Sequence, residues 1–190
     1  PYRRQRQMCI RDSFSGPAYF NWFWMGNLDG WGGPLPQSFI DRHEKLQQFI
    51  LHGERSLGMQ PVLPAFTGHV PPAFERKFPD AAVRKTSWVD FPEVCILDPD
   101  EALFTRIGTL FLDEQTRLYG TNHLYSADTF NENLPPTHDS LYLSRISRRV
   151  FDAMQASDPA ATWVMQGWLF HHDSEFWGRR ETEALLSAVP

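Results

Sequence analysis

From Pro36 the chain alternates between segments with the apolar spacing of a helix and short strand-like segments. The first helical pattern starts after Pro36 and ends at Gly58, a residue type that commonly terminates helices. Its apolar side holds Leu46, Phe49, Ile50, Gly53 and Leu57. A second helix is predicted from Leu103, Ile107, Leu110 and Leu118, and a third from Leu143, Ile146, Val150 and Met154. A last helix is predicted over residues 173–188.

Three short segments between these helices predict β-strands, at residues 62–66, 123–130 and 162–168. The first lies in the run PVLPAF, which has no polar alternation, as expected of a strand that is buried on both faces. Residues 75–98 have no clear period and are predicted to hold a short helix and the aromatic loop KTSWVDF. Because a helix follows each predicted strand, we expect the three strands to be parallel neighbours in one sheet.

Repeated strand–helix units fit either an open doubly wound sheet or a closed barrel. No Gly-rich turn follows any predicted strand, which disfavours an open-sheet nucleotide-binding domain. Polar residues instead collect at the ends of the strands, as in barrels whose strand-to-helix loops build the site. The predicted fold class is therefore α/β, a partial TIM-like (β/α) barrel. A complete barrel has eight strands and about 250 residues, so we expect roughly half of one here.

The composition narrows the class of protein further. With 190 residues, of which 42% are hydrophobic and 14% aromatic, the chain predicts a globular domain rather than a disordered one. No apolar stretch reaches the roughly 18 uncharged residues of a membrane helix, so we expect no membrane partner. The net charge of −5 disfavours nucleic acid as a partner.

Residues 1–13 differ from the rest of the chain because they are basic and polar. The stretch RRQRQMCIRDS, residues 3–13, resembles a translated sequencing adapter, so we interpret residues 1–13 as an artefact and not as structure. The alternative is a basic arm that binds nucleic acid, but its four arginines lack interleaved aromatic residues. The incomplete barrel domain is then residues 14–190, with Cys95 as its one cysteine.

The strongest candidate for chemistry is ADTFNENLPP, which places Asp128 and Glu132 near the end of the second predicted strand. A carboxylic acid that is partly desolvated by aromatic neighbours can protonate a leaving oxygen, which is the role of the acid in glycoside hydrolysis. The residues alone leave open that both carboxylates are solvated or cap the following helix. His69, at the end of the first strand, fits a loop-capping role better than a pocket-lining one.

Tryptophans accompany this segment at predicted strand ends and loops, namely Trp22, Trp24, Trp31, Trp88 and Trp168. Aromatic faces beside carboxylates and amides are typical of sugar sites, although each tryptophan taken singly is more often a core residue. No HExxH or close Cys/His spacing predicts a metal site, and no G-x-S-x-G predicts a serine nucleophile. We therefore expect a carbohydrate site without metal or cofactor.

Five motifs then occur in a fixed order: FSGPA, WFWMGNL with WGGPLP, GMQPVLPAFTGHVPP, DTFNE with a following PP, and QGWLF with FWG. From Phe14 to the C-terminus this order resembles the barrel domain of the α-N-acetylglucosaminidases, glycoside hydrolase family 89. The resemblance implies a retaining exo-glycosidase that removes terminal α-linked N-acetylglucosamine from glycans or glycosaminoglycans. It also implies a lysosomal location in animals and a secreted or periplasmic one in bacteria.

The resemblance also implies which residues of this chain form the site. Glu132 matches the acid/base of the family. The substrate-binding positions are Trp22, Met25, Asn27, Trp88, Asn131 and Trp168, and we expect them to converge with Glu132 on one concavity.

The family's nucleophile, a second glutamate, lies beyond Pro190. Retaining chemistry needs two carboxyl groups about 5 to 5.5 Å apart, and Asp128 lies about 13 Å from Glu132 along an extended strand. We therefore expect the chain alone, without the remainder of its barrel, to be inactive. The alternative function is a non-catalytic carbohydrate-binding barrel.

Overall fold

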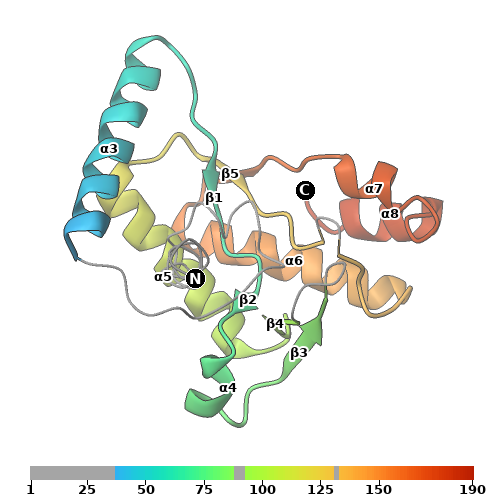
Figure 1. Ribbon diagram of the computed structural model, residues 1–190. Helices are drawn as coiled ribbons and strands as arrows, with labels where there is room; N and C mark the ends of the chain where they lie inside the picture. The colour runs from blue at the N-terminus through green and yellow to red at the C-terminus, as the bar shows by residue number, and fades with distance from the viewer. Residues whose placement is uncertain (1–36, 88–92, 131–132) are drawn as a thin grey trace, which may run out of the picture.

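The computed structural model describes residues 37–87, 93–130 and 133–190. The helices are α3 (Gln37–Ser56), α4 (Ala73–Lys77), α5 (Ala102–Tyr119), α6 (Ser140–Ser157), α7 (Trp168–His172) and α8 (Arg179–Leu186). The strands are β1 (Leu63–Pro64), β2 (His69–Val70), β3 (Val83–Thr86), β4 (Val94–Leu97), β5 (Leu124–Ser126) and β6 (Thr162–Trp163). Figure 1 shows their arrangement in space.

A parallel sheet with the order β1-β5-β6 forms the centre of the structure. Pro64 pairs with Ser126, and Tyr125 pairs with Trp163. The three predicted strands are therefore confirmed as parallel neighbours, although each is shorter than its predicted range. In the described part of the chain this sheet stays open, so the structure is part of a barrel and not a closed one.

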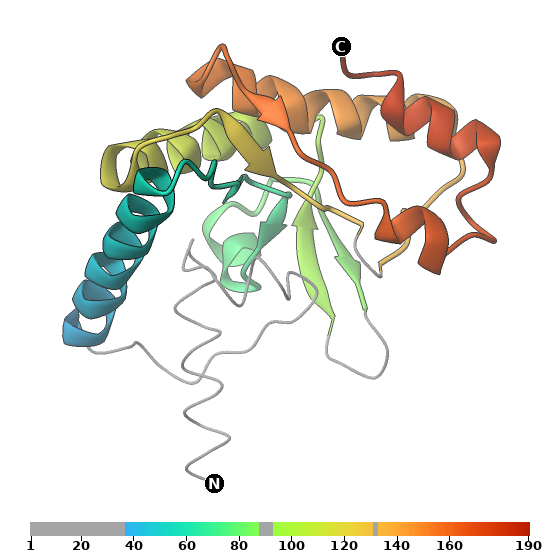
Figure 2. The same ribbon diagram turned by 90° about the horizontal axis from the view of Figure 1, so that it is seen from above.

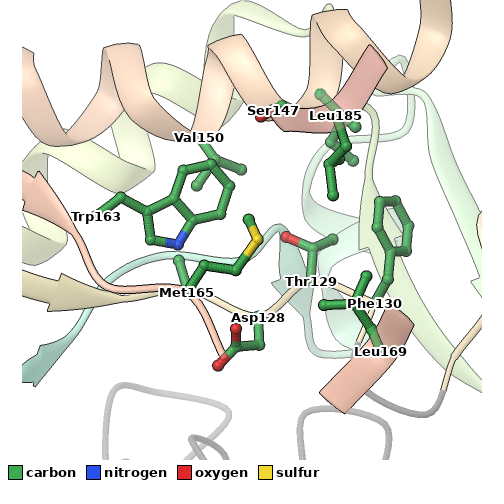
Figure 3. A pocket seen from close by; sticks show the side chains of 11 residues that line it. Asp128, Thr129, Phe130, Ser147, Val150, Trp163, Met165, Leu169 and Leu185 are labelled. Carbon is green, nitrogen blue, oxygen red and sulfur yellow. The ribbon is translucent and has the colours of Figure 1, made fainter. Parts of the chain in front are cut away.

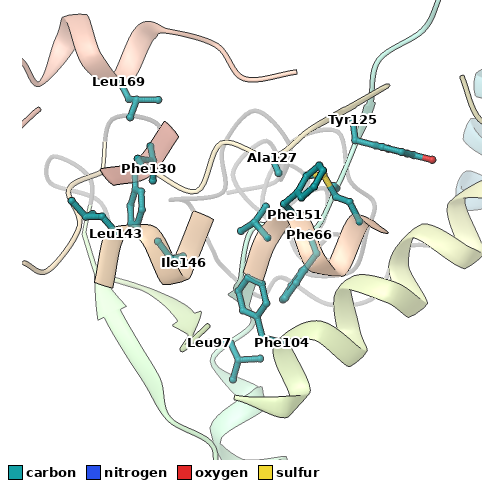
Figure 4. Close-up of a cluster of buried hydrophobic side chains, with 14 of the residues drawn as sticks. Phe66, Leu97, Phe104, Tyr125, Ala127, Phe130, Leu143, Ile146, Phe151 and Leu169 are labelled. Atoms are coloured by element: carbon teal, nitrogen blue, oxygen red, sulfur yellow. The ribbon is translucent and has the colours of Figure 1, made fainter. Parts of the chain in front are cut away.

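Helices α5 and α6 pack side by side over one face of this sheet, as Figure 2 shows. The predicted apolar side of α6 is confirmed, because Leu143, Ile146, Val150 and Met154 are each 1% exposed or less. Asp139 caps the start of α6 by accepting a hydrogen bond from the Leu141 backbone N–H. Figure 4 shows part of the resulting core between the sheet and these helices.

A second, antiparallel sheet with the order β2-β4-β3 is inserted between β1 and α5. The short helix predicted within residues 75–98 is present as α4, but strands β3 and β4 were not predicted. All four residues of β4 are buried, so this strand has none of the polar alternation that marks a half-buried strand. The insertion extends the loop at the carboxyl end of β1.

The predicted apolar side of α3 is wrong, because Phe49 and Leu57 are 75% and 80% exposed. The opposite side, which contains Leu51, contacts α5 instead. Gln48 Nε2 donates to the Leu118 carbonyl at 3.2 Å, and Arg55 Nη1 donates to the Tyr119 carbonyl at 2.7 Å. Polar side chains with long apolar stems make this contact, which a pattern of apolar residues cannot predict.

Two further helix predictions need correction. In α5 the buried side is offset by about one residue from the predicted one, with Phe104 fully buried and Leu110 58% exposed. The predicted helix over residues 173–188 is shorter than expected, because residues 173–176 form a turn and Gly178 is extended, so that α8 begins only at Arg179.

A hydrogen-bonded network fixes the amino-terminal end of β5. The hydroxyl of fully buried Tyr125 donates to Asp158 Oδ2 at 2.7 Å, and His123 Nδ1 lies 2.8 Å from the same oxygen. The Ala160 backbone N–H donates to Asp158 Oδ1 at 3.0 Å. Burial by itself raises the pKa of Asp158, but these hydrogen bonds outweigh it and hold the pKa below its usual value.

The first prediction concerns the contact between α5 and α6 at Gly108. A Cβ at this position would lie 2.7 Å from the Cβ of Ala153, closer than two methyl groups can pack. Gly108→Ala should lower the free energy of unfolding by about 1–3 kcal/mol through overpacking, although alanine favours a helix by about 1 kcal/mol. Urea denaturation measures the change.

Gly53→Ala is the matched control, because nothing lies within 4 Å of a Cβ there. That variant should be as stable as the original chain or more stable. Ala153→Gly combined with Gly108→Ala should recover part of the loss. Equal stability of the Gly108→Ala and Gly53→Ala variants would contradict the close helix contact.

The second prediction concerns Asp158. Because its folded pKa lies below the unfolded value, the ionised carboxylate stabilises the fold above the unfolded pKa, and this stability is lost as the pH falls through the folded pKa. Asp158→Asn should lower the free energy of unfolding at neutral pH by about 1–3 kcal/mol. The deficit should shrink as the pH falls from about 5 towards 2.

Denaturation at a series of pH values measures this dependence, with exposed Asp80→Asn as the control. A deficit of the same size at every pH would show that the charge of Asp158 does not contribute.

Candidate functional site

The carboxyl ends of β1, β5 and β6 meet at one edge of the parallel sheet. The Ala65 N–H donates to the Ser126 carbonyl at 2.8 Å, and the Val164 N–H donates to the Tyr125 carbonyl at 2.7 Å. Strand β5 is thus held on both sides up to its last residues. Sites in barrels are built from the loops at this edge, so the segments that follow the three strands form the candidate site.

Asp128 lies two residues beyond the end of β5 and is half-buried. Its carboxylate accepts a hydrogen bond from Ser126 Oγ at 3.0 Å and a longer one from the Gln166 backbone N–H at 3.4 Å. Burial raises the pKa of Asp128 above its usual value, while the hydrogen bonds from Ser126 and Gln166 act in the opposite direction. The carboxylate therefore connects the segment after β5 to the segment after β6.

A second hydrogen bond joins the inserted antiparallel sheet to the segment that follows β5. Thr86 Oγ1, at the end of β3, donates to Asn133 Oδ1, and Asn133 is only 4% exposed. Asn133 directly follows Glu132 in the sequence, and Thr86 precedes Trp88 by two residues. The residues that flank Glu132 and Trp88 are thus in direct contact.

Trp168 is the one predicted site residue within the described part of the chain. It is the first residue of α7, just beyond β6, and it is 43% exposed. Its ring stacks on His172 with centroids 5.3 Å apart and lies 5.8 Å from the His171 ring. The other predicted site residues, Trp22, Met25, Asn27, Trp88, Asn131 and Glu132, lie outside the described residues. Their convergence with Trp168 stays a prediction.

His69 is a buried residue of β2, with its Nδ1 2.8 Å from Thr67 Oγ1. Burial lowers its pKa to about 4, so the ring is neutral through the physiological range. A neutral, buried ring that bonds to its own loop fits the capping role expected from the sequence.

A small cavity of about 20 Å³ lies behind the end of β5, between β6 and α6 (Figure 3). Three polar side-chain atoms in its lining residues have no hydrogen-bond partner among the described residues: Thr129 Oγ1, Ser147 Oγ and Trp163 Nε1. This volume suits about one water molecule and is far too small for a sugar. The cavity is therefore not the candidate substrate site.

Among the described residues, no group of three or more His, Cys, Asp or Glu side chains is placed to hold a metal ion. None of the helices described is long and apolar enough to cross a membrane.

Comparison with known proteins identifies close relatives. The family model of the α-N-acetylglucosaminidase TIM-barrel domain matches residues 5–190. Human α-N-acetylglucosaminidase is 47% identical over 189 residues, which cover 97% of this chain and 25% of the human protein. The chain thus spans about a quarter of the length of this relative.

Solved structures of a family 89 glycoside hydrolase from Clostridium perfringens match with a TM-score of 0.73 and 25% identity, over 97% of this chain and 22% of theirs. One holds 2-acetamido-1,2-dideoxynojirmycin, and another holds that enzyme's substrate, GlcNAc-alpha-1,4-galactose. The partial (β/α) barrel predicted from the sequence is therefore a piece of a TIM-barrel domain.

The third prediction concerns the bond between Thr86 and Asn133. Thr86→Val keeps the shape of the side chain but leaves the buried Asn133 oxygen without a donor, so it should lower the free energy of unfolding by about 1–3 kcal/mol. Thr86→Ser, which keeps the hydroxyl, is the matched control and should lose less. Chemical denaturation compares the two variants, and an equal loss in both would show that the hydrogen bond contributes nothing.

Proposed function

Because the chain belongs to the α-N-acetylglucosaminidase family, we propose that it supplies the acid/base half of a retaining exo-glycosidase site. The substrate is a glycan or glycosaminoglycan with a terminal α-linked N-acetylglucosamine. The supporting observation is that residues 128–130, the start of the DTFNE motif, lie just beyond β5 at the edge where β1, β5 and β6 all end. Glu132 is the only carboxylate of that motif beyond Asp128, whose oxygens are already hydrogen-bonded.

The chemistry follows from the two-carboxylate mechanism of retaining glycosidases. Glu132, protonated, donates its proton to the glycosidic oxygen as the bond to the leaving group breaks. A second carboxylate attacks the anomeric carbon from the opposite face and forms a covalent glycosyl-enzyme intermediate. Glu132, now ionised, then removes a proton from the water that releases the sugar. The nucleophile comes from outside these 190 residues.

Asp128 does not fit the role of nucleophile. Both of its oxygens point towards donors of the protein, Oδ2 to Ser126 and Oδ1 to Gln166. A nucleophile needs a carboxylate oxygen directed at the anomeric carbon and about 5 to 5.5 Å between the two carboxyl groups.

Substrate binding is assigned to aromatic and amide side chains around Glu132. Trp168 supports this role, because an aromatic face at the rim of the strand ends can stack on the CH face of a sugar ring. The further substrate-binding residues in this proposal are Trp22, Met25, Asn27, Trp88 and Asn131.

The whole activity belongs to a longer protein that contains this chain, called the full-length protein below. A chain that spans a quarter of its human relative supplies only some of the strands of a barrel. The proposed location of the full-length protein is the lysosome in an animal, or the periplasm or cell exterior in a bacterium.

The fourth prediction tests Glu132 in the full-length protein. Glu132→Gln should slow hydrolysis of substrates with poor leaving groups by about 10²- to 10⁴-fold, which is the usual contribution of acid/base catalysis. Aryl glycosides with good leaving groups should be affected much less, because a nitrophenolate departs without a proton. Azide should restore part of the turnover on these activated substrates, since an anion attacks the intermediate without a general base.

Glu183→Gln makes the same chemical change at an exposed position of α8 and should leave both rates unchanged. Equal rate losses on both substrate classes without azide rescue would exclude Glu132 as the acid/base. Sugar binding without any turnover by the full-length protein would favour a non-catalytic carbohydrate-binding barrel.

The fifth prediction concerns the 190-residue chain itself. It should hydrolyse no aryl α-N-acetylglucosaminide, because the nucleophile is missing. Measurable turnover that depends on Glu132 would show that the chain contains both carboxylates.

A further inference from the structure

Backbone pairing between β5 and β6 ends before the candidate site begins. The ladder joins Leu124 to Thr162 and Tyr125 to Trp163, and the Val164 N–H then donates to the Tyr125 carbonyl. No backbone hydrogen bond joins residues 126–130 to residues 165–168 in the structure as described. These are the segments that lead to Glu132 and to Trp168.

Beyond the end of this ladder, the carboxylate of Asp128 links the two segments through hydrogen bonds. It accepts hydrogen bonds from Ser126 Oγ on its own segment and from the Gln166 backbone N–H on the neighbouring one. Donors from two segments therefore converge on one half-buried carboxylate, and charge-assisted bonds of this kind are stronger than neutral ones.

Both segments continue directly into the site. Asp128 precedes Glu132 by four residues, and Gln166 precedes Trp168 by two. Only short stretches of chain therefore separate the bonded pair from the proposed acid and from Trp168.

We propose that Asp128 is a positioning residue that locks the segment bearing Glu132 to the segment bearing Trp168. This inference rests on the proposed function. Asp128 acts through the two segments and does not touch the reacting atoms. Catalytic groups must be held to within about 0.5 Å of their productive geometry, and a side-chain bridge supplies this accuracy where the strands separate.

Ionisation of Asp128 suits this role. Burial favours the neutral acid and raises the pKa, whereas the hydrogen bonds from Ser126 and Gln166 favour the carboxylate. Both carboxylate oxygens accept a hydrogen bond, so the ionised form of Asp128 makes both bonds of the bridge.

Hydrogen exchange on the 190-residue chain tests the bridge without any catalysis. In Asp128→Ala the Gln166 amide should exchange with solvent about tenfold faster or more, since its acceptor is gone. Ser126→Ala, which removes a donor on the other side of the carboxylate, should leave that amide protected. Unchanged exchange in Asp128→Ala would overturn the bridge.

Kinetics of the full-length protein test the effect on the site. Asp128→Ala should slow the hydrolysis of substrates with poor leaving groups by about 10- to 100-fold, because the catalytic group is misplaced. Aryl glycosides should slow less, because the affected group is the proton donor. Asp128→Asn, which keeps an acceptor oxygen and the shape of the side chain, should recover part of the rate.

The leaving-group dependence separates positioning from simple loss of stability. A variant that is only less stable loses the same fraction of both rates, because fewer molecules are folded. Equal losses on the two substrate classes would therefore overturn the inference. So would wild-type rates in Asp128→Ala.

The two proposals fail in different ways. If the unaltered full-length protein does not hydrolyse α-N-acetylglucosaminides, the proposed function is wrong. If it does so and Glu132→Gln shows the expected leaving-group pattern while Asp128→Ala does not, only the positioning role of Asp128 is wrong.

Discussion

The pairing of β5 between β1 and β6 is the constraint on which the rest of the structure depends. Because all three strands are parallel, their carboxyl ends meet at one edge, and the segments that follow them share one space. The backbone bonds from Ala65 and Val164 hold β5 on both sides until its last residues. Helices α5 and α6 then cover the sheet, and Gly108 allows the two helices to pack closely against each other.

The carboxylates at the two ends of β5 have different roles. At its amino-terminal end, Asp158 collects hydrogen bonds from Tyr125 and His123, and the low pKa of this carboxylate marks a contribution to stability. At its carboxyl end, Asp128 has a raised pKa, because burial there outweighs the hydrogen bonds that favour its charge. A division between a stabilising face and a chemical face is usual in (β/α) barrels.

Much of the fold could be predicted from the sequence where a single pattern determines burial. An unbroken apolar run indicated β1, the alternation of strand-like and helical segments indicated β5 and β6, and the spacing of Leu143 and Ile146 indicated the buried side of α6. The predicted buried side of α3 was wrong because Gln48 and Arg55 contact α5 by donating hydrogen bonds to its backbone carbonyls. A pattern of apolar residues does not reveal such polar contacts. Strand β4 was missed because a fully buried strand has no polar alternation, and its partner β3, with no fully buried residue, was missed with it.

The site was less accessible to sequence reasoning than the fold. Composition and strand position made Glu132 a candidate acid, but its role came from the order of five motifs. Asp128 was considered as a substitute nucleophile, a solvated side chain or a helix cap, although the spacing of Ser126 and Asp128 allowed a local hydrogen bond. Its bond to Gln166 joins residues that lie 38 positions apart, and only the folded sheet brings them together.

The central claim is that these strand ends assemble one sugar site around Glu132. The most direct measurement is a crystal structure of the full-length protein with a bound N-acetylglucosamine-like inhibitor. A Glu132 carboxylate oxygen should lie about 2.6–3.2 Å from the inhibitor atom that stands for the glycosidic oxygen, with the Trp168 ring against the sugar. A Glu132 side chain that points into the core or away from the inhibitor would contradict the account.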